Sequence, residues 1–155
     1  MADDIRVEIR GLKETQAEME RIVRDMQGGP FLQGMRDATL IVTRDARLNA
    51  PVDTGRLRAS ITPEVRPHGN TVLGVVGSNV AYAPYVELGT RPHWPPPGAL
   101  AVWARRHGVS EFLVRRAIGR RGTKAHKFLE RALTENAGRI VRLIGATVGK
   151  IVRSD

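Results

Sequence analysis

The sequence predicts an α+β fold in which a small, mostly antiparallel sheet packs against helices and a C-terminal helix ends the chain. Apolar residues recur at helical spacing in both the first and the last third of the chain. Between these regions lie two runs of alternating or β-branched residues, separated by a turn rich in proline and glycine. A chain of 155 residues with 41% apolar residues supports one core, so residues 1–155 are predicted to form a single domain.

The first third of the chain is predicted to be a strand followed by two helices. The strand is predicted where apolar residues alternate with charged ones, at Ile5, Val7 and Ile9. Apolar spacing then predicts a helix over Leu12–Met26, ended by the glycines before Pro30. A second helix is predicted over Phe31–Asn49. Its buried stripe is predicted to consist of Leu32, Met35, Thr39, Val42 and Ala46.

The stretch from Ala50 to Ile61 is predicted to join the second helix to the sheet. Proline stops the helix, aspartate can bond the backbone two residues on, and glycine accepts the positive φ of a tight turn. After the turn, apolar and polar residues alternate, which predicts a half-buried strand over Arg56–Val65, with Pro63 at an edge or a bulge. The predicted structural turn consists of Pro51, Asp53, Thr54 and Gly55.

The next segments are predicted to complete a hairpin and lead into a stiff loop. A turn at residues 67–70 and a β-branched strand over residues 71–78 predict the hairpin. Gly74 and Gly77 indicate a bulge or a close approach of another backbone. A short helical or turn segment starts at residue 79 or 81, and four prolines then predict an extended loop over Thr90–Gly98.

The last third of the chain is predicted to be helical. A short helix is predicted over Gly98–His107, with a glycine stop at residue 108. Ser110 is predicted to cap a helix over Glu111–Arg120. Its inward residues are predicted to be Phe112, Leu113, Ala117 and Ile118. The last helix is predicted over Ala125–Val152, and its glycines weaken residues 138–155, which should fray or pack on a partner.

The positive charge is concentrated in one segment. The chain carries a net charge of +9, and residues 91–131, with ten Lys or Arg and two Glu, carry +8 of it. The excess favours contact with nucleic acid or an acidic protein surface, and a solvated basic helix face remains an equal alternative. The predicted basic contact surface comprises Arg105, Arg106, Arg115, Arg116, Arg120 and Arg121.

The sequence lacks the patterns typical of enzymes and metal sites. It contains no cysteine, and its four histidines are scattered without a carboxylate or second histidine at ligand spacing. It shows no serine in a glycine-flanked elbow and no glycine loop of phosphate-binding form. We therefore expect no catalytic residue, cofactor or metal. The charged N-terminus and the absence of a long apolar run also predict neither a signal peptide nor a membrane span.

Two stretches are predicted to form one surface where subunits or partners meet. Tyrosines have one polar end and one apolar body, which suits interfaces, and they lie here beside the proline loop. The predicted interface residues are Tyr82, Tyr85, Glu87, Gly89, Thr90 and Trp94. The alternative is that these residues serve local packing, turns and solvation.

Three motifs in order resemble one known family. They are Ala-Pro-Val-Asp-Thr-Gly-Arg-Leu-Arg-Ala-Ser-Ile at 50–61, Tyr-Ala-Pro-Tyr-Val-Glu-Leu-Gly-Thr at 82–90 and Arg-Gly-Thr-Lys-Ala-His-Lys-Phe-Leu-Glu-Arg-Ala-Leu at 121–133. The set resembles the minor tail-component family of long-tailed bacteriophages and prophages, the tail-completion or head–tail joining (neck) proteins. The resemblance covers about residues 30–137, and residues 92–122 look like a basic insertion.

The resemblance implies a structural virion protein rather than an enzyme. Such proteins form a ring, typically of six copies, at the head-proximal end of the tail, where they complete the tail tube and meet the head–tail connector. DNA passes through the ring, so transient nonspecific DNA contact is implied, with assembly in the host cytoplasm and no membrane. Because cations in the lumen would hold phosphates, we expect the basic segment to face an acidic partner or the outer rim. The alternative function is a basic nucleic-acid-binding module.

Overall fold

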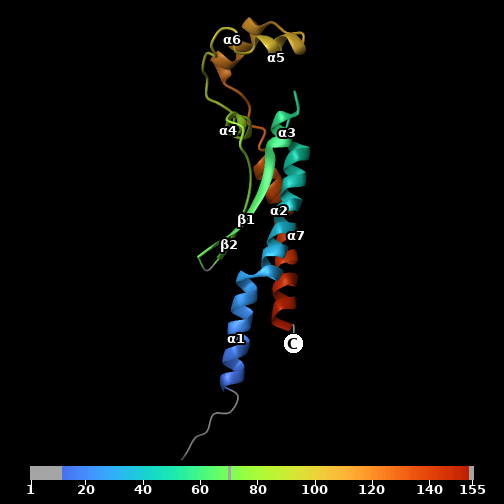
Figure 1. The fold of residues 1–155 in the computed structure, drawn as a ribbon. Helices are drawn as coiled ribbons and strands as arrows, with labels where there is room; N and C mark the ends of the chain where they lie inside the picture. The colour runs from blue at the N-terminus through green and yellow to red at the C-terminus, as the bar shows by residue number, and fades with distance from the viewer. Residues whose placement is uncertain (1–11, 70, 154–155) are drawn as a thin grey trace, which may run out of the picture. The chain divides into compact units, whose positions relative to one another are not determined.

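The computed structural model describes residues 12–69 and 71–153 (Figure 1). The elements in chain order are α1 (Leu12–Gln27), α2 (Gly29–Asn49), α3 (Arg56–Ser60), β1 (Ile61–His68), β2 (Thr71–Ser78), α4 (Ala83–Leu88), α5 (Ala101–Arg106), α6 (Glu111–Arg121) and α7 (Phe128–Arg153). The two strands form one antiparallel hairpin, so the predicted α+β class with a long C-terminal helix is confirmed. The strand predicted around Ile5 and Ile9 lies outside the described residues.

The chain forms two compact units. Unit 1 contains the described parts of Met1–Thr39, Glu64–Val75 and Gly138–Asp155, and unit 2 contains Leu40–Pro63 and Val76–Ala137. Consequently α2, both strands and α7 each contribute residues to both units.

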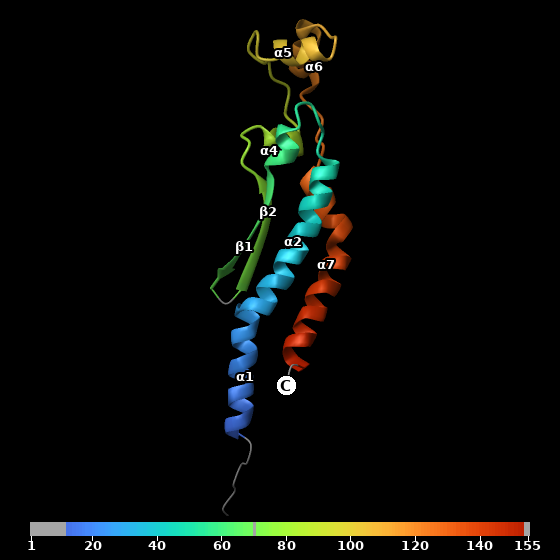
Figure 2. The ribbon, with the colours of Figure 1, turned by 45° about the vertical axis from the view of Figure 1, so that its right-hand side comes forward.

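Unit 1 is held together by close contacts at small residues. A Cβ added to Gly34 in α2 would lie 2.7 Å from Oγ1 of Thr147 in α7, so the two helices, which run side by side in Figure 2, approach at a glycine. Gly74 in β2 approaches α2 as closely, since its added Cβ would lie 2.8 Å from Cγ2 of Thr39. Gly74 is thus approached closely by side chains of α2 and not by another backbone as predicted, and Gly77 has no neighbour within 4 Å of such a Cβ.

Unit 2 has a core formed by the second half of α2, the start of α7 and the α3–β1 junction. Its two largest fully buried side chains are Phe128 and Ile61. Asn136 in α7 donates to Oδ2 of Asp45 in α2 over 2.8 Å, and its side chain is buried. Arg47 donates from Nη2 to the backbone oxygen of Ile61 over 2.6 Å. These bonds fix α2 against both α7 and the start of the sheet.

The strand predicted over Arg56–Val65 is wrong in its first half, because residues 56–60 form the helix α3 and the strand begins at Ile61. Leu57 and Ile61 are both buried, and a separation of four places them on one side of a helical turn as well as in an alternating strand. The helix is set by Gly55, whose φ of 81° turns the chain and whose oxygen accepts from the N–H of Ala59 over 2.9 Å.

The inward face predicted for α6 is also partly wrong. Phe112 and Leu113 are 60% and 58% exposed, and the partly buried apolar residues are Val114, Ala117 and Ile118. The helix follows Gly108 and Ser110 as predicted, but the side chain of Ser110 makes no capping bond. Two adjacent large residues at its start could be assigned to either side, and packing against the preceding loop decides the orientation.

Substitution of Gly34 tests the close approach of α2 and α7 in unit 1. We expect Gly34→Ala to lower the free energy of unfolding by about 1–3 kcal/mol, because the added methyl group collides with Thr147. Adding Thr147→Ala should recover most of the loss, since it removes the colliding atoms. Urea unfolding followed by circular dichroism measures both. As a control, Gly145→Ala in α7 meets nothing within 4 Å and should be neutral or stabilise by up to about 1 kcal/mol. Equal losses of unfolding free energy for the Gly34 and Gly145 variants would contradict a close approach of α2 and α7 at Gly34.

Candidate functional site

The second and third sequence motifs pair with each other in unit 2. Thr90 and Thr123 form an antiparallel bridge, in which each N–H donates to the other's oxygen over 3.1 and 3.2 Å. The N–H groups of His126 and Lys127 donate to the oxygens of Val86 and Glu87 over 2.9 and 3.0 Å. We call the paired segments 86–90 and 123–130 the motif clamp.

The carboxylate of Glu87 caps the N-terminus of α7. Its Oε2 accepts from the N–H of Leu129 and its Oε1 from the N–H of Glu130, both over 2.9 Å. The first N–H groups of a helix have no partner within the helix, and an acid there also faces the positive end of the helix dipole. Glu87 therefore fixes the start of the 26-residue helix to a segment more than forty residues upstream.

Two glycines allow the motif clamp to close. Gly89 has φ 71°, and a Cβ at this position would lie 2.5 Å from the oxygen of Thr123. Gly122 has φ 71° as well, and an added Cβ would overlap the oxygen of Thr90 at 1.9 Å. Both positions therefore require glycine for its backbone conformation and for the space it leaves. Lys127, with φ 52°, turns the chain into α7, which explains why the helix begins at Phe128 and not at Ala125.

The predicted turn at residues 51–55 lies in the same unit. Oγ1 of Thr54 accepts from the N–H of Arg56 over 3.4 Å, so Thr54 rather than Asp53 bonds the backbone two residues on. The carboxylate of Asp53 instead accepts from Arg106 in α5 over 2.7 Å. This ion pair is half exposed and contributes at most about 1 kcal/mol, but it ties the turn to the basic segment.

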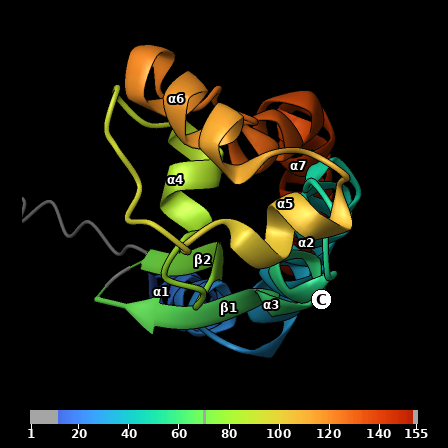
Figure 3. The same cartoon turned by 90° about the horizontal axis from the view of Figure 1, so that it is seen from above.

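The proline loop, Thr90–Gly98, is attached to α6. Nε of Arg115 donates to the oxygen of Pro95 over 2.9 Å, and Pro95 is buried. The ring of Trp94 covers Gly119, since an added Cβ there would lie 2.6 Å from the indole. Figure 3 shows the loop joining α4 to the pair α5 and α6, which pack against each other. Arg115 thus holds the loop in place.

Unit 2 exposes an aromatic surface on α4. Tyr82, Tyr85 and Leu88 are separated by three residues each, so they lie on one side of the short helix. Tyr85 is 63% and Leu88 71% exposed. We call these three residues the α4 face. Of the predicted interface residues, the structure thus leaves Tyr82, Tyr85 and the 59% exposed Trp94 accessible, and places Glu87, Gly89 and Thr90 in the motif clamp.

Unit 2 also exposes a surface that mixes large apolar and cationic side chains. Phe112, Leu113, Arg116 and Arg120 fall within about 100° of one another around α6, and all four are exposed. We call them the α6 face. Within the described residues, no carboxylate lies within ion-pair distance of Arg105, Arg116, Arg120 or Arg121, in contrast to Arg106. The α6 face therefore offers unpaired cations beside apolar area.

Three exposed apolar residues were not predicted from the sequence to lie on an interaction surface. Leu88 continues the spacing of three residues from Tyr82 and Tyr85, and this pattern in the sequence could have identified it. Phe112 and Leu113 were assigned to the core because large apolar residues are usually buried. Among residues 12–69 and 71–153, no group of three or more His, Asp or Glu is arranged to hold a metal ion. No helix in this part of the chain is long and apolar enough to span a membrane.

Residues 13–89, about half of the chain, match the family model described as "Bacteriophage HK97-gp10, putative tail-component". The match contains the first two motifs and ends at Gly89, before the proline loop. The third motif lies beyond it and is linked to the second by the motif clamp. No curated protein and no solved structure matches the chain.

Removing one acceptor from Glu87 tests the cap on α7. We expect Glu87→Gln to lower the free energy of unfolding by about 1–2 kcal/mol, because one N–H of the first turn and the helix dipole lose their charged partner. Thermal and urea unfolding measure the change. The matched control is Glu135→Gln in the third turn of α7, where a 3.6 Å ion pair with Arg131 is exposed and should contribute less than about 0.5 kcal/mol. Similar losses in the two variants would exclude the capping role.

Proposed function

We propose that this chain, which belongs to the HK97-gp10-like tail-component family of bacteriophages, assembles into a ring at the head-proximal end of the phage tail. The family supports a structural tail protein that contacts other tail or head proteins. In this proposal the ring, typically of six copies as the resemblance of the three motifs implies, completes the tail tube and meets the head connector. DNA passes through its lumen.

The observation that carries the proposal is the α4 face. Tyr85 and Leu88 on α4, together with Tyr82 at its N-cap, are exposed, and the motif clamp holds the end of this helix in place. Exposed tyrosines on a rigid support are typical of interface hot spots, because little conformational entropy is lost when they are covered. A closed ring is built from heterologous contacts, in which each subunit offers two different patches. The α4 face supports one of them.

The α6 face favours a protein partner over DNA. Phosphate neutralisation needs only cations, and a surface that slides along DNA gains nothing from Phe112 and Leu113. Arginine and phenylalanine together are enriched in protein interfaces, where the guanidinium pairs with carboxylates and the ring is desolvated. We therefore assign the α6 face to an acidic protein surface, with the tail tube and connector proteins as neighbours of the ring and DNA contact only in passing.

A stop codon early in this gene tests the proposed function in particles from the phage or an induced prophage. Electron microscopy should show DNA-filled heads and separate tails, because the joint between them is missing. If the tails are overlong instead, the subunit terminates the growth of the tail tube. Complementation with the intact gene is the control. Intact infectious particles would reject the proposed function.

Removing the aromatic side chain of Tyr85 tests whether the α4 face takes part in assembly. Tyr85→Ala should leave the subunit folded, with a change in unfolding free energy below about 1 kcal/mol, because the side chain is 63% exposed. The same variant should lower the yield of joined, infectious particles at least tenfold. Val141→Ala on α7, at 70% exposure, is the matched control and should have no effect on the yield. Wild-type particle yield from Tyr85→Ala would remove the α4 face from the interface.

A further inference from the structure

The first half of α1 is an amphipathic helix whose described side chains are exposed. Every residue from 14 to 20 is exposed, and the second half of α1 is attached to α7, where Arg21 donates to the oxygen of Ile151 over 3.3 Å. Helices of this length are marginal in water without tertiary packing. Packing against a partner surface would therefore stabilise this half of α1.

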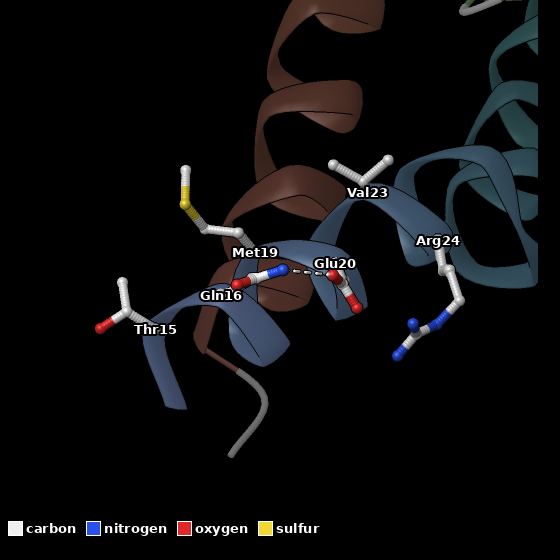
Figure 4. Close-up of a pocket in the computed structure, with 6 residues that line it drawn as sticks. All are labelled: Thr15, Gln16, Met19, Glu20, Val23 and Arg24. Atoms are coloured by element: carbon white, nitrogen blue, oxygen red, sulfur yellow. Dashed lines mark hydrogen bonds between the residues drawn. The ribbon is translucent and has the colours of Figure 1, made fainter. Parts of the chain in front are cut away.

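The exposed side of α1 has an apolar centre. Met19 and Val23 are four residues apart, project to the same side in Figure 4 and are 64% and 56% exposed. They line an open pocket together with Thr15, Gln16, Glu20 and Arg24. We call Met19 and Val23 the α1 stripe. A surface helix with such an uncovered stripe is typical of a helix that docks on another surface.

The α1 stripe is bordered by carboxylates. Glu20 lies on one side of the stripe, where it accepts from Gln16 over 3.2 Å, and Glu18 lies on the other. Glu18 forms an ion pair with Arg21 over 2.6 Å, and the hydrogen bond from Arg21 lowers the pKa of this carboxyl. Glu14 adds a further acid in the first turn. The docking side of α1 thus has an apolar centre with a carboxylate on each border, and Arg24 adds a cation at the rim of the pocket.

The α6 face has the complementary chemistry. Phe112 and Leu113 supply apolar area, and Arg116 and Arg120 supply two cations without a carboxylate partner among the described residues. At 1.5 Å per residue α1 is about 24 Å and α6 about 16 Å long, so α1 is long enough to span the α6 face. Apolar contacts combined with ion pairs are common in protein interfaces.

We infer that α1 of one copy docks with its α1 stripe on the α6 face of a second copy. Glu18 and Glu20 then lie beside Arg116 and Arg120, while Met19 and Val23 cover Phe112 and Leu113. The inference rests on the proposed ring, since it names one heterologous contact between neighbouring subunits. It leaves the α4 face for another contact. The acidic surface that the cations of α6 require is thus supplied by the chain itself.

Cysteine cross-linking tests this contact, because the natural chain contains no cysteine. A Met19→Cys chain mixed with a Leu113→Cys chain should form a disulfide-linked heterodimer under mild oxidation, since the two thiols belong to different copies. The matched control is Ala17→Cys, which is exposed on the opposite side of α1. Denaturing gels and mass spectrometry of the linked peptides give the readout. Equal cross-linking of Leu113→Cys to residues 17 and 19 would overturn the inference.

Charge reversal provides a second, independent readout. Arg116→Glu with Arg120→Glu should weaken self-association about tenfold or more, measured by analytical ultracentrifugation at low salt. Glu18→Arg with Glu20→Arg should do the same, and a chain carrying all four changes should recover association. Arg139→Glu with Arg142→Glu on exposed positions of α7 is the control for net charge. Circular dichroism checks the fold. Failure of the fourfold variant to recover would overturn the contact.

The two proposals fail in different ways. If particles from the stop-codon phage lack the joint but the reversed chains associate like the wild type, the proposed function stands and the α1–α6 contact is rejected. If residues 19 and 113 cross-link selectively but the stop-codon phage is fully infectious, the contact stands as self-association and the role at the tail joint is rejected.

Discussion

The structure of unit 2 depends on one carboxylate. Glu87 provides both of its oxygens to the first turn of α7, and the backbone bonds of the motif clamp hold that carboxylate in place. The same pairing fixes the end of α4, the start of the proline loop and the chain that leaves α6. Because these segments come from distant parts of the sequence, the clamp closes the loop that contains the predicted basic contact surface, residues 105–121. The exposed faces of α4 and α6 owe their fixed positions to it.

A second constraint is the small size of the buried residues. Half of the buried apolar side chains in the described part of the chain are alanines, among them Ala38, Ala46, Ala83 and Ala132, and glycines occupy the closest contacts. Burial of a methyl group contributes little hydrophobic free energy, whereas Tyr85, Leu88 and other large residues remain in water. The isolated chain thus leaves a large part of its available apolar area uncovered. Such a balance is expected of a subunit that gains stability when it assembles.

The sequence predicted the long elements well and the contacts between them poorly. Helical periodicity identified α1, α2 and α7, because their apolar stripes extend over several turns. Over five residues, however, Leu57 and Ile61 fit a strand as well as a helical turn, so α3 was missed. The three motifs were found from the residues alone, but the role of Glu87 was not, since a cap supplied from a distant segment has no local pattern. Phe112 and Leu113 were misassigned because burial was inferred from residue type.

The combination of charge and apolar area on the α6 face bears on how a ring could form. Unpaired arginines act at a distance of about one Debye length, roughly 8 Å at physiological salt, and accelerate the encounter with an acidic surface. Once the surfaces meet, exposed ion pairs add little affinity, and the lifetime of the contact depends on the apolar residues that become desolvated. Arg116 and Arg120 would thus select and orient the partner, while Phe112 and Leu113 would hold it. A surface with arginines alone would associate rapidly but bind weakly. A surface with apolar residues alone would bind without selecting its partner.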